Sequence, residues 1–259
     1  MRRVRITGLC LVVGCALCAV SATSALGTAP EYGRCIKKAK AEGKGYTASK
    51  CTVAGEGSKA KYEWVPGAAK AKFTSTGGIG VLSTVGGATV ECKAESSDGE
   101  FVPGNDKEEA GIFVIFTGCK ATGVPCTSPG HAAGELETNE LEGIVGWENK
   151  AKKKTDLELY PAKSVKSGLF IEFECVGLVI KVRGKVLVPI KNDTMTESTT
   201  LKFNATKGKQ KPEKWEESSE KAILESSFSN VREGAWEQSG QKITSTVSGA
   251  EKLELNTVI

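Results

Sequence analysis

Pairs of glutamates two residues apart are the side chains in this sequence best suited to chemistry. Glu135 and Glu137 form one pair, with Glu140 nearby, and Glu172 and Glu174 form the other. Residues two apart on an extended chain project from the same face. Two carboxyl groups held about 5 Å apart are the general acid and the nucleophile of retaining glycosidases. The pairs therefore predict one candidate activity, a carboxylate-dependent extracellular glycan hydrolase.

The same pattern has an ordinary structural interpretation, because an antiparallel strand with one solvated face alternates apolar and polar residues. Aromatic residues make up only 6% of the chain, which is few for a sugar-binding cleft. A concave cleft that combines one glutamate pair with Trp64, Trp147, Trp215 or Trp236 would favour the hydrolase. The same acids on a convex, solvated face would count against it.

Other catalytic patterns are missing from the sequence. His131 is the only histidine and lies in a Gly/Pro/Ala loop, and no G-x-S-x-G elbow is present. The glycines at Gly77–Gly80 and Gly86–Gly87 lack the Lys-Ser/Thr of a phosphate-binding loop and are interpreted as turns. The sequence thus predicts no catalytic residue, cofactor site or metal site.

The N-terminus has the three parts of a secretory signal peptide. Arg2, Arg3 and Arg5 precede the apolar run from Ile6 to Val20, and small residues follow. We expect cleavage after Ala25. An uncleaved membrane anchor is disfavoured because the apolar run is short for a span of about 20 residues. A second alternative is a lipobox ending at Cys15, which would anchor the chain to a membrane by a lipid.

Six cysteines remain after the predicted signal peptide, an even number in a chain expected to reach an oxidising compartment. We therefore expect three disulfides. Proximity along the chain favours pairing Cys35 with Cys51 and Cys119 with Cys126, which leaves Cys92 to pair with Cys175. Zinc is the competing interpretation, but the chain has no C-x2-C pair and one histidine.

The charge of the chain excludes a nucleic-acid partner. Three of the 35 Lys and Arg residues lie in the predicted signal, so 32 basic residues face 31 acidic ones in the mature chain. A near-neutral protein lacks the basic surface that binds phosphates. The expected partner is an extracellular polymer, surface or protein.

The longest run of strand-forming residues predicts a central antiparallel hairpin over 168–190. Leu169, Ile171, Phe173 and Cys175 share one face of its first arm. On the second arm a common face is expected for the even-numbered residues Ile180, Val182, Val186, Val188 and Ile190. Short strands separated by turns recur along the chain, with three expected near its end, at 235–238, 242–249 and 252–256. This spacing predicts an antiparallel β-sandwich or barrel.

Three regions are expected: a signal peptide (1–25), a cystine-closed N-terminal segment (26–66) and an antiparallel β domain (67–259). The N-terminal segment has few aliphatic residues but contains Tyr32, Tyr46, Tyr62 and Trp64. We expect these aromatic residues to pack on the β domain. A carbohydrate-stacking platform is the functional alternative for them.

Several stretches resemble a family of secreted proteins from soil actinobacteria. In the N-terminal segment they are P-E-Y-G-R-C at 30–35, G-x-G-Y-T-x-x-x-C-T at 43–52 and K-Y-E-W-x-P-G at 61–67. Further similar stretches lie at 118–126, 134–143 and 188–196. The resemblance implies secretion and adds no site residue, because no activity or ligand is assigned to that family. The leading hypothesis is therefore a non-enzymatic secreted or cell-envelope binding or structural module.

Overall fold

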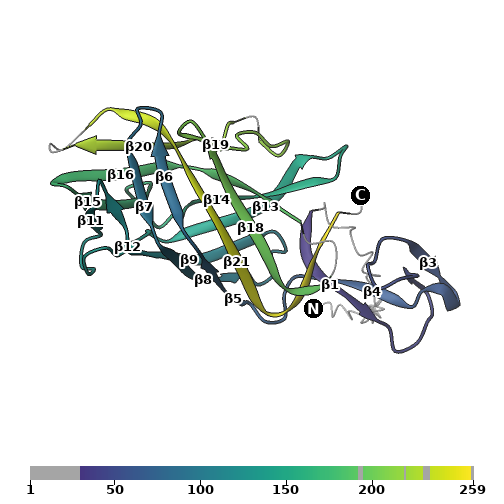
Figure 1. Cartoon of the computed structure of the whole chain (residues 1–259). Coiled ribbons are helices and arrows are strands. Elements are labelled where there is room, and N and C mark those ends of the chain that lie inside the picture. Colours follow the sequence, from purple (N-terminus) through teal and green to yellow (C-terminus); the bar gives the residue numbers. More distant parts are fainter. Residues whose placement is uncertain (1–29, 192–194, 219, 230–233, 258–259) are drawn as a thin grey trace, which may run out of the picture.

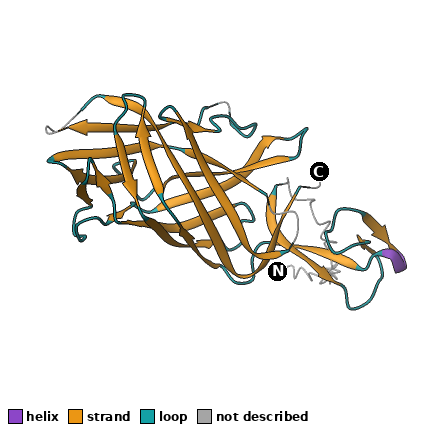
Figure 2. Ribbon diagram, in the orientation of Figure 1, coloured by secondary structure: helices purple, strands orange, loops and turns teal. Residues whose placement is uncertain are grey.

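The protein is built almost entirely from β-strands. The structure is a computed structural model that describes residues 30–191, 195–218, 220–229 and 234–257. Figure 2 shows strands throughout the described chain and one helical turn, η1 (Gly57–Lys59). Every strand pairing is antiparallel. The predicted all-β antiparallel class is confirmed. The predicted signal peptide and Cys15 lie outside the described residues.

One long strand, β21 (Trp236–Asn256), runs the length of the barrel (Figure 1). Its first part pairs with β20 (Leu224–Ser229) and β6 (Gly80–Thr84). Its middle pairs with β5 (Lys72–Gly77) and β18 (Thr196–Thr206), and its end pairs with β1 (Glu31–Lys37). The three strands expected over this stretch are therefore one continuous strand.

Eight strands close into a ring at the end of the barrel away from β1, which we call the distal ring. Each strand pairs with the next, and the last pairs with the first. Besides β20, β21 and β6, the ring contains β7 (Thr89–Cys92), β10 (Lys120–Ala121), β11 (Val124–Thr127), β15 (Leu169–Cys175) and β16 (Leu178–Gly184). A closed ring has no unpaired strand edge.

A second row of strands, the proximal row, continues the barrel toward β1. Strand pairing runs from β18 through β21 and β5 to the strands β8 (Ala94–Phe101), β9 (Glu108–Thr117), β13 (Leu141–Asn149), β14 (Lys154–Pro161) and β17 (Val186–Ile190). The two end strands of this row, β17 and β18, are in contact. The short strands β12 (Leu136–Glu137) and β19 (Lys209–Lys211) pair with β9 and β18, respectively.

Apolar side chains line the inside of the barrel. On β21, Ile243 and Ser245 are buried while Thr244 and Thr246 are exposed, which is the alternation expected of a wall with one inner face. The inner residues form two adjoining clusters, one of which includes Phe73, Phe173 and Ile180. Burial of this apolar surface is the main favourable contribution to folding.

The predicted hairpin is present as β15 and β16, and its inner residues are those expected. Ile180, Val182, Val186, Val188 and Ile190 are all buried. The second arm is interrupted after Gly184, however, where β17 leaves β16 and pairs with β14 instead. The hairpin therefore contributes to both rows of the barrel.

Residues 30–66 form a small N-terminal module beside the proximal end of the barrel (Figure 1). It consists of β1, β2 (Lys44–Tyr46), β3 (Ala54–Glu56), η1 and β4 (Tyr62–Pro66), with a disulfide between Cys35 and Cys51. The pairing of β1 with β21 connects the module to the barrel wall. Tyr32 is buried and its ring lies against Phe101 at a centroid distance of 4.9 Å, so this aromatic residue packs as expected.

Residues 212–218 and 220–223 cover part of the outer wall, and we call them the outer strap. Trp215 of the strap is buried together with Leu187 of β17, and Ile144 of β13 packs against both. Gly146 makes this approach possible, because a Cβ atom there would lie 2.3 Å from the Trp215 ring. The strap gives the barrel a second, smaller apolar cluster outside the main core.

Two of the three expected disulfide pairings were wrong. All six cysteines form disulfides, but Cys92 pairs with Cys119 and Cys126 pairs with Cys175. Closure of the distal ring explains the difference. Strand β10 lies between β7 and β11, while β11 lies beside β15, so spatial neighbours differ from sequence neighbours. The two disulfides thus join segments that are 27 and 49 residues apart in sequence.

Peptide mapping of the non-reduced protein should recover these two pairings. We expect cross-linked peptides that contain Cys92 with Cys119 and Cys126 with Cys175. Replacing Cys126 and Cys175 by serine should reduce the free energy of unfolding by about 4 kcal/mol, because their disulfide closes a long loop. A Cys119–Cys126 peptide would contradict the ring order described above.

Candidate functional site

The glutamate pair at Glu172 and Glu174 lies on the outer wall of the barrel. Both side chains are exposed, and the Glu172 carboxylate lies 3.6 Å from the Lys181 ammonium on the neighbouring strand. Neither residue lines the barrel cavity described below. The structure therefore places this pair on the convex, solvated face that counts against a glycosidase site.

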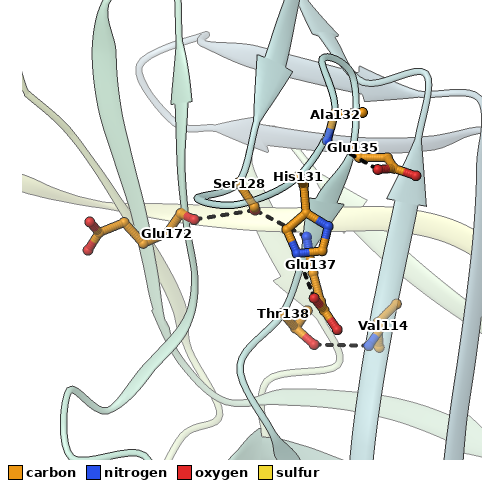
Figure 3. Close-up of polar contacts among 8 residues, drawn as sticks. All are labelled: Val114, Ser128, His131, Ala132, Glu135, Glu137, Thr138 and Glu172. Carbon is orange, nitrogen blue, oxygen red and sulfur yellow. Dashed lines mark hydrogen bonds and ion pairs between the residues drawn. The ribbon is translucent and has the colours of Figure 1, made fainter.

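The other pair, Glu135 and Glu137, is divided between two partners (Figure 3). The Glu137 carboxylate lies 2.7 Å from Nε2 of His131, while Glu135 accepts a hydrogen bond from the Ala132 backbone N–H at 3.3 Å. Leu136 between them is buried in the core. The two carboxylates are directed to different neighbours, and the hydrolase stays an untested alternative that this geometry does not favour.

The contact between His131 and Glu137 resembles that between the base and the orienting acid of a catalytic triad (Figure 3). Ser128 lies nearby and would be the nucleophile of such a triad. Ser128 is only 2% exposed. Its Oγ donates to the Glu172 carbonyl at 3.4 Å and accepts from the Glu137 backbone N–H at 3.1 Å. Because the hydroxyl is buried and bonded to backbone groups, it connects strands rather than serving as a nucleophile.

The interior of the barrel contains a cavity. A cavity of about 180 Å³ extends through both rows of strands, and its walls are mostly apolar. Phe73 of β5, Leu159 of β14, Val182 of β16 and Val247 of β21 are among the lining residues, which shows that opposite walls contribute. The cavity exists because inward-facing side chains from strands all around the barrel do not fill its centre.

A buried carboxylate lies in the cavity wall at Glu95 of β8. The Glu95 side chain is 6% exposed, and its two oxygens accept hydrogen bonds of 2.7 Å from the hydroxyls of Ser75 and Ser245. These serines come from β5 and β21. A Cβ atom on Gly77 would lie 2.5 Å from Glu95 Oε2, so the glycine provides the space that this carboxylate occupies.

A second buried carboxylate lies where the N-terminal module meets the barrel. Tyr32 of β1 donates a 2.6 Å hydrogen bond from its hydroxyl to Glu109 of β9, and both residues line the cavity. Burial raises the pKa of the Glu109 carboxyl to about 7, and the hydrogen bond from Tyr32 partly offsets that rise. Burial, followed by the nearby Glu109, raises the pKa of the Tyr32 hydroxyl well above its usual value. Tyr32 therefore lines the cavity at the end of the barrel nearest the N-terminal module, where it covers Glu109.

The lining residues identify where the cavity reaches the surface. Glu197 and Ser198 of β18 are the exposed members of the lining among the described residues. They lie at an irregularity in the pairing of β18 with β21, where Thr196 pairs with Leu253 but Ser198 pairs with Ser248. The extra residues of β21 leave the wall locally unpaired. We call this place the mouth.

The described lining of the cavity is acidic. It contains Glu95, Glu109, Glu197 and Glu251, and no Lys, Arg or His. Glu251 is already engaged at the mouth, because it accepts from the Lys70 backbone N–H and lies 3.8 Å from the Arg34 guanidinium. The described cavity wall thus has acidic side chains and no basic one.

Another buried acid, Asp156 of β14, is separate from the cavity. It is fully buried on the wall beside Gly146 and Pro189, and neither carboxylate oxygen has a hydrogen-bond partner in the described protein. Burial, and next the nearby Glu148, raises the pKa of this carboxyl to about 7. Asp156 does not line the barrel cavity, so we expect its effect to be on stability.

Sequence reasoning did not identify the residues of the cavity. Glu95 and Ser97 alternate with Ser96 and Asp98 in a strand that is polar on both faces, so the pattern does not reveal an inner side. The sequence did offer one indication. Gly99 and Phe101 fall on the same face of the strand as Glu95, and the aromatic Phe101 could have identified that face as the inner one. Tyr32 was expected to pack on the β domain, but its position inside the barrel end depends on the β1–β21 pairing.

The described residues contain neither a metal-binding cluster nor a membrane-spanning helix. They contain no group of three or more His, Cys, Asp or Glu side chains placed to hold a metal ion. No helix in this part of the chain is both long and apolar enough to cross a membrane. The three disulfides are typical of an oxidising, extracellular-type environment.

Comparison with known proteins finds no matching family model, no matching curated protein and no matching solved structure. The structural class of the protein is therefore defined by its fold and its internal cavity. It is an eight-stranded antiparallel β-barrel with an internal, mostly apolar cavity.

The Glu109 carboxyl should make stability depend on pH. Its pKa is about 7 in the folded protein against 4.5 in the unfolded chain, so ionisation above pH 4.5 favours unfolding. The resulting loss, about 3 kcal/mol, is complete once the pH exceeds 7. Glu109→Gln should therefore stabilise the protein more at pH 8 than at pH 4, as measured by urea denaturation.

Glu100→Gln is the matched control for this measurement, because Glu100 is an exposed residue on β8. The control should give the same change in unfolding free energy at both pH values. Asp156→Asn should behave like Glu109→Gln, since burial raises the pKa of that carboxyl in the same direction. An equal effect of Glu109→Gln at pH 4 and pH 8 would contradict the burial of an ionisable Glu109.

Proposed function

We propose that this protein is a secreted or cell-envelope binding protein, without a catalytic role, whose barrel interior holds one small, mainly apolar molecule. The observation that carries the proposal is the cavity of about 180 Å³ inside the barrel. Barrels of eight strands are wide enough to hold one small ligand. Small-molecule sites are typically concave and apolar with a few polar groups, which matches this lining.

The size of the cavity limits the ligand. An apolar cavity of about 150 Å³ in another protein accepts benzene. A cavity of 180 Å³ therefore suits a single aromatic ring or a short branched chain, on the order of ten non-hydrogen atoms. A larger ligand would fit only if Tyr32, or Glu197 and Ser198 at the mouth, moved away from the cavity.

The proposed location rests on several observations. The basic and apolar pattern of residues 1–25 is that of a secretory signal, and the disulfides are compatible with export. The resemblance to secreted actinobacterial proteins agrees with export. Lipid attachment at Cys15 is the alternative and would place the barrel at a membrane surface. The extracellular polymer, surface or protein partner expected from the sequence stays a prediction, and the cavity adds a small ligand to it.

Fluorobenzene tests the proposal, because it is apolar, matches the cavity in size and can be followed by fluorine NMR. We expect it to bind the full mature protein. Val247→Phe should weaken this binding at least tenfold, because Val247 lies in the middle part of β21 and lines the cavity. The added ring would occupy the space that the ligand needs.

Val124→Phe is the matched control, since Val124 is exposed on the outer surface of β11. It should leave fluorobenzene binding unchanged. Filling a core position can destabilise a protein by about 1–3 kcal/mol, so near-ultraviolet circular dichroism should confirm that Val247→Phe is folded. Failure of the wild-type protein to bind fluorobenzene would overturn the proposed function.

A further inference from the structure

The polar groups in the cavity wall indicate what the ligand carries besides its apolar part. This inference rests on the proposed function and concerns the same cavity. Both deeply buried polar centres, Glu95 and Glu109, are carboxylates. An ionised carboxylate only accepts hydrogen bonds, so it selects for donors. The wall therefore favours a ligand with a donating group over one with an accepting group.

Glu95 is the centre that is free to receive such a group. Glu109 is covered by Tyr32, whose hydroxyl donates to it at 2.6 Å. The Glu95 oxygens each accept one hydrogen bond from a serine, and a carboxylate has about four acceptor positions in total. Glu95 therefore has remaining acceptor capacity directly beside the cavity.

The charge of Glu95 is not balanced by the protein. None of the ion pairs among the described residues includes Glu95, and no basic side chain is present in the described lining. A buried charge is costly unless it is paired and hydrogen-bonded. The two serines supply hydrogen bonds, and a cationic ligand would supply the missing opposite charge.

The mouth of the cavity also favours a cationic ligand. Glu197 is exposed there, while Glu251 is already near Arg34 and bonded to Lys70. An acidic entrance with low-dielectric walls attracts cations and repels anions. The mouth and the interior would thus select for the same sign of charge.

We propose that the cavity takes a small apolar amine in its protonated form, with the ammonium group donating to Glu95 and the hydrocarbon part against the apolar wall. Ser75 and Ser245 hold the carboxylate in place for this contact. Gly77 leaves the room that the Glu95 carboxylate occupies beside Ser245. The ligand class is defined by these contacts, an ammonium group on a body of roughly one aromatic ring.

A matched series of ligands tests this inference on the wild-type protein. 2-Phenylethylamine, 2-phenylethanol and phenylacetate have similar apolar parts and differ in charge, and each can compete with fluorobenzene in the fluorine NMR assay at pH 7. We expect the amine to bind at least tenfold more tightly than the alcohol, and phenylacetate to bind most weakly.

Glu95→Gln assigns the preference to one residue. Glutamine can still accept from a serine but carries no charge, so the advantage of the amine over the alcohol should fall to less than threefold while fluorobenzene still binds. Glu100→Gln, on the outer face of the same strand, should keep the full advantage. If Glu95→Gln does not fold, Ser245→Ala provides a second variant, and it should reduce the advantage by misplacing the carboxylate.

The outcomes separate the two proposals. If fluorobenzene binds but the amine binds no better than the alcohol, the inference about charge is overturned and the apolar site remains. If phenylacetate binds most tightly, the inference is overturned as well. If neither fluorobenzene nor any member of the series binds, the proposed function itself is wrong.

Discussion

The continuous pairing of β21 is the constraint on which the rest of the structure depends. This strand belongs to the distal ring through β20 and β6, to the proximal row through β5 and β18, and to the N-terminal module through β1. Buried backbone groups must be hydrogen-bonded, and a strand paired on both sides meets that requirement over most of its length. Its inner residues Ile243, Ser245 and Val247 contribute directly to the cavity wall. One strand thus connects the two rows of the barrel and forms part of the cavity wall.

The interior combines a stable core with a few costly polar groups. Glu95, Glu109 and Tyr32 are buried in surroundings that are otherwise apolar. Each has a hydrogen-bond partner, but the protein provides no positive charge for Glu95 in the described lining. A core selected for stability alone would have apolar residues at these places. The buried carboxylates are therefore the feature of the interior that a binding role explains best.

Much of the fold could be predicted from the sequence. Alternation along 169–190 predicted the hairpin and its buried face, and the even number of cysteines predicted three disulfides. The pairings of Cys92, Cys119, Cys126 and Cys175 could not be predicted, because they depend on which strands become neighbours when the ring closes. The cavity was missed for a similar reason. Glu95 lies in a polar strand, and only the curvature of the closed wall turns one face of that strand inward.

Diffraction from crystals held under xenon pressure would test the central claim most directly. Xenon binds empty apolar cavities without needing a polar partner. The account predicts strong anomalous density inside the barrel, near Phe73, Leu159 and Val247. A barrel interior without xenon, in crystals that take up the gas elsewhere, would contradict the claim that this wall encloses a ligand-sized apolar space.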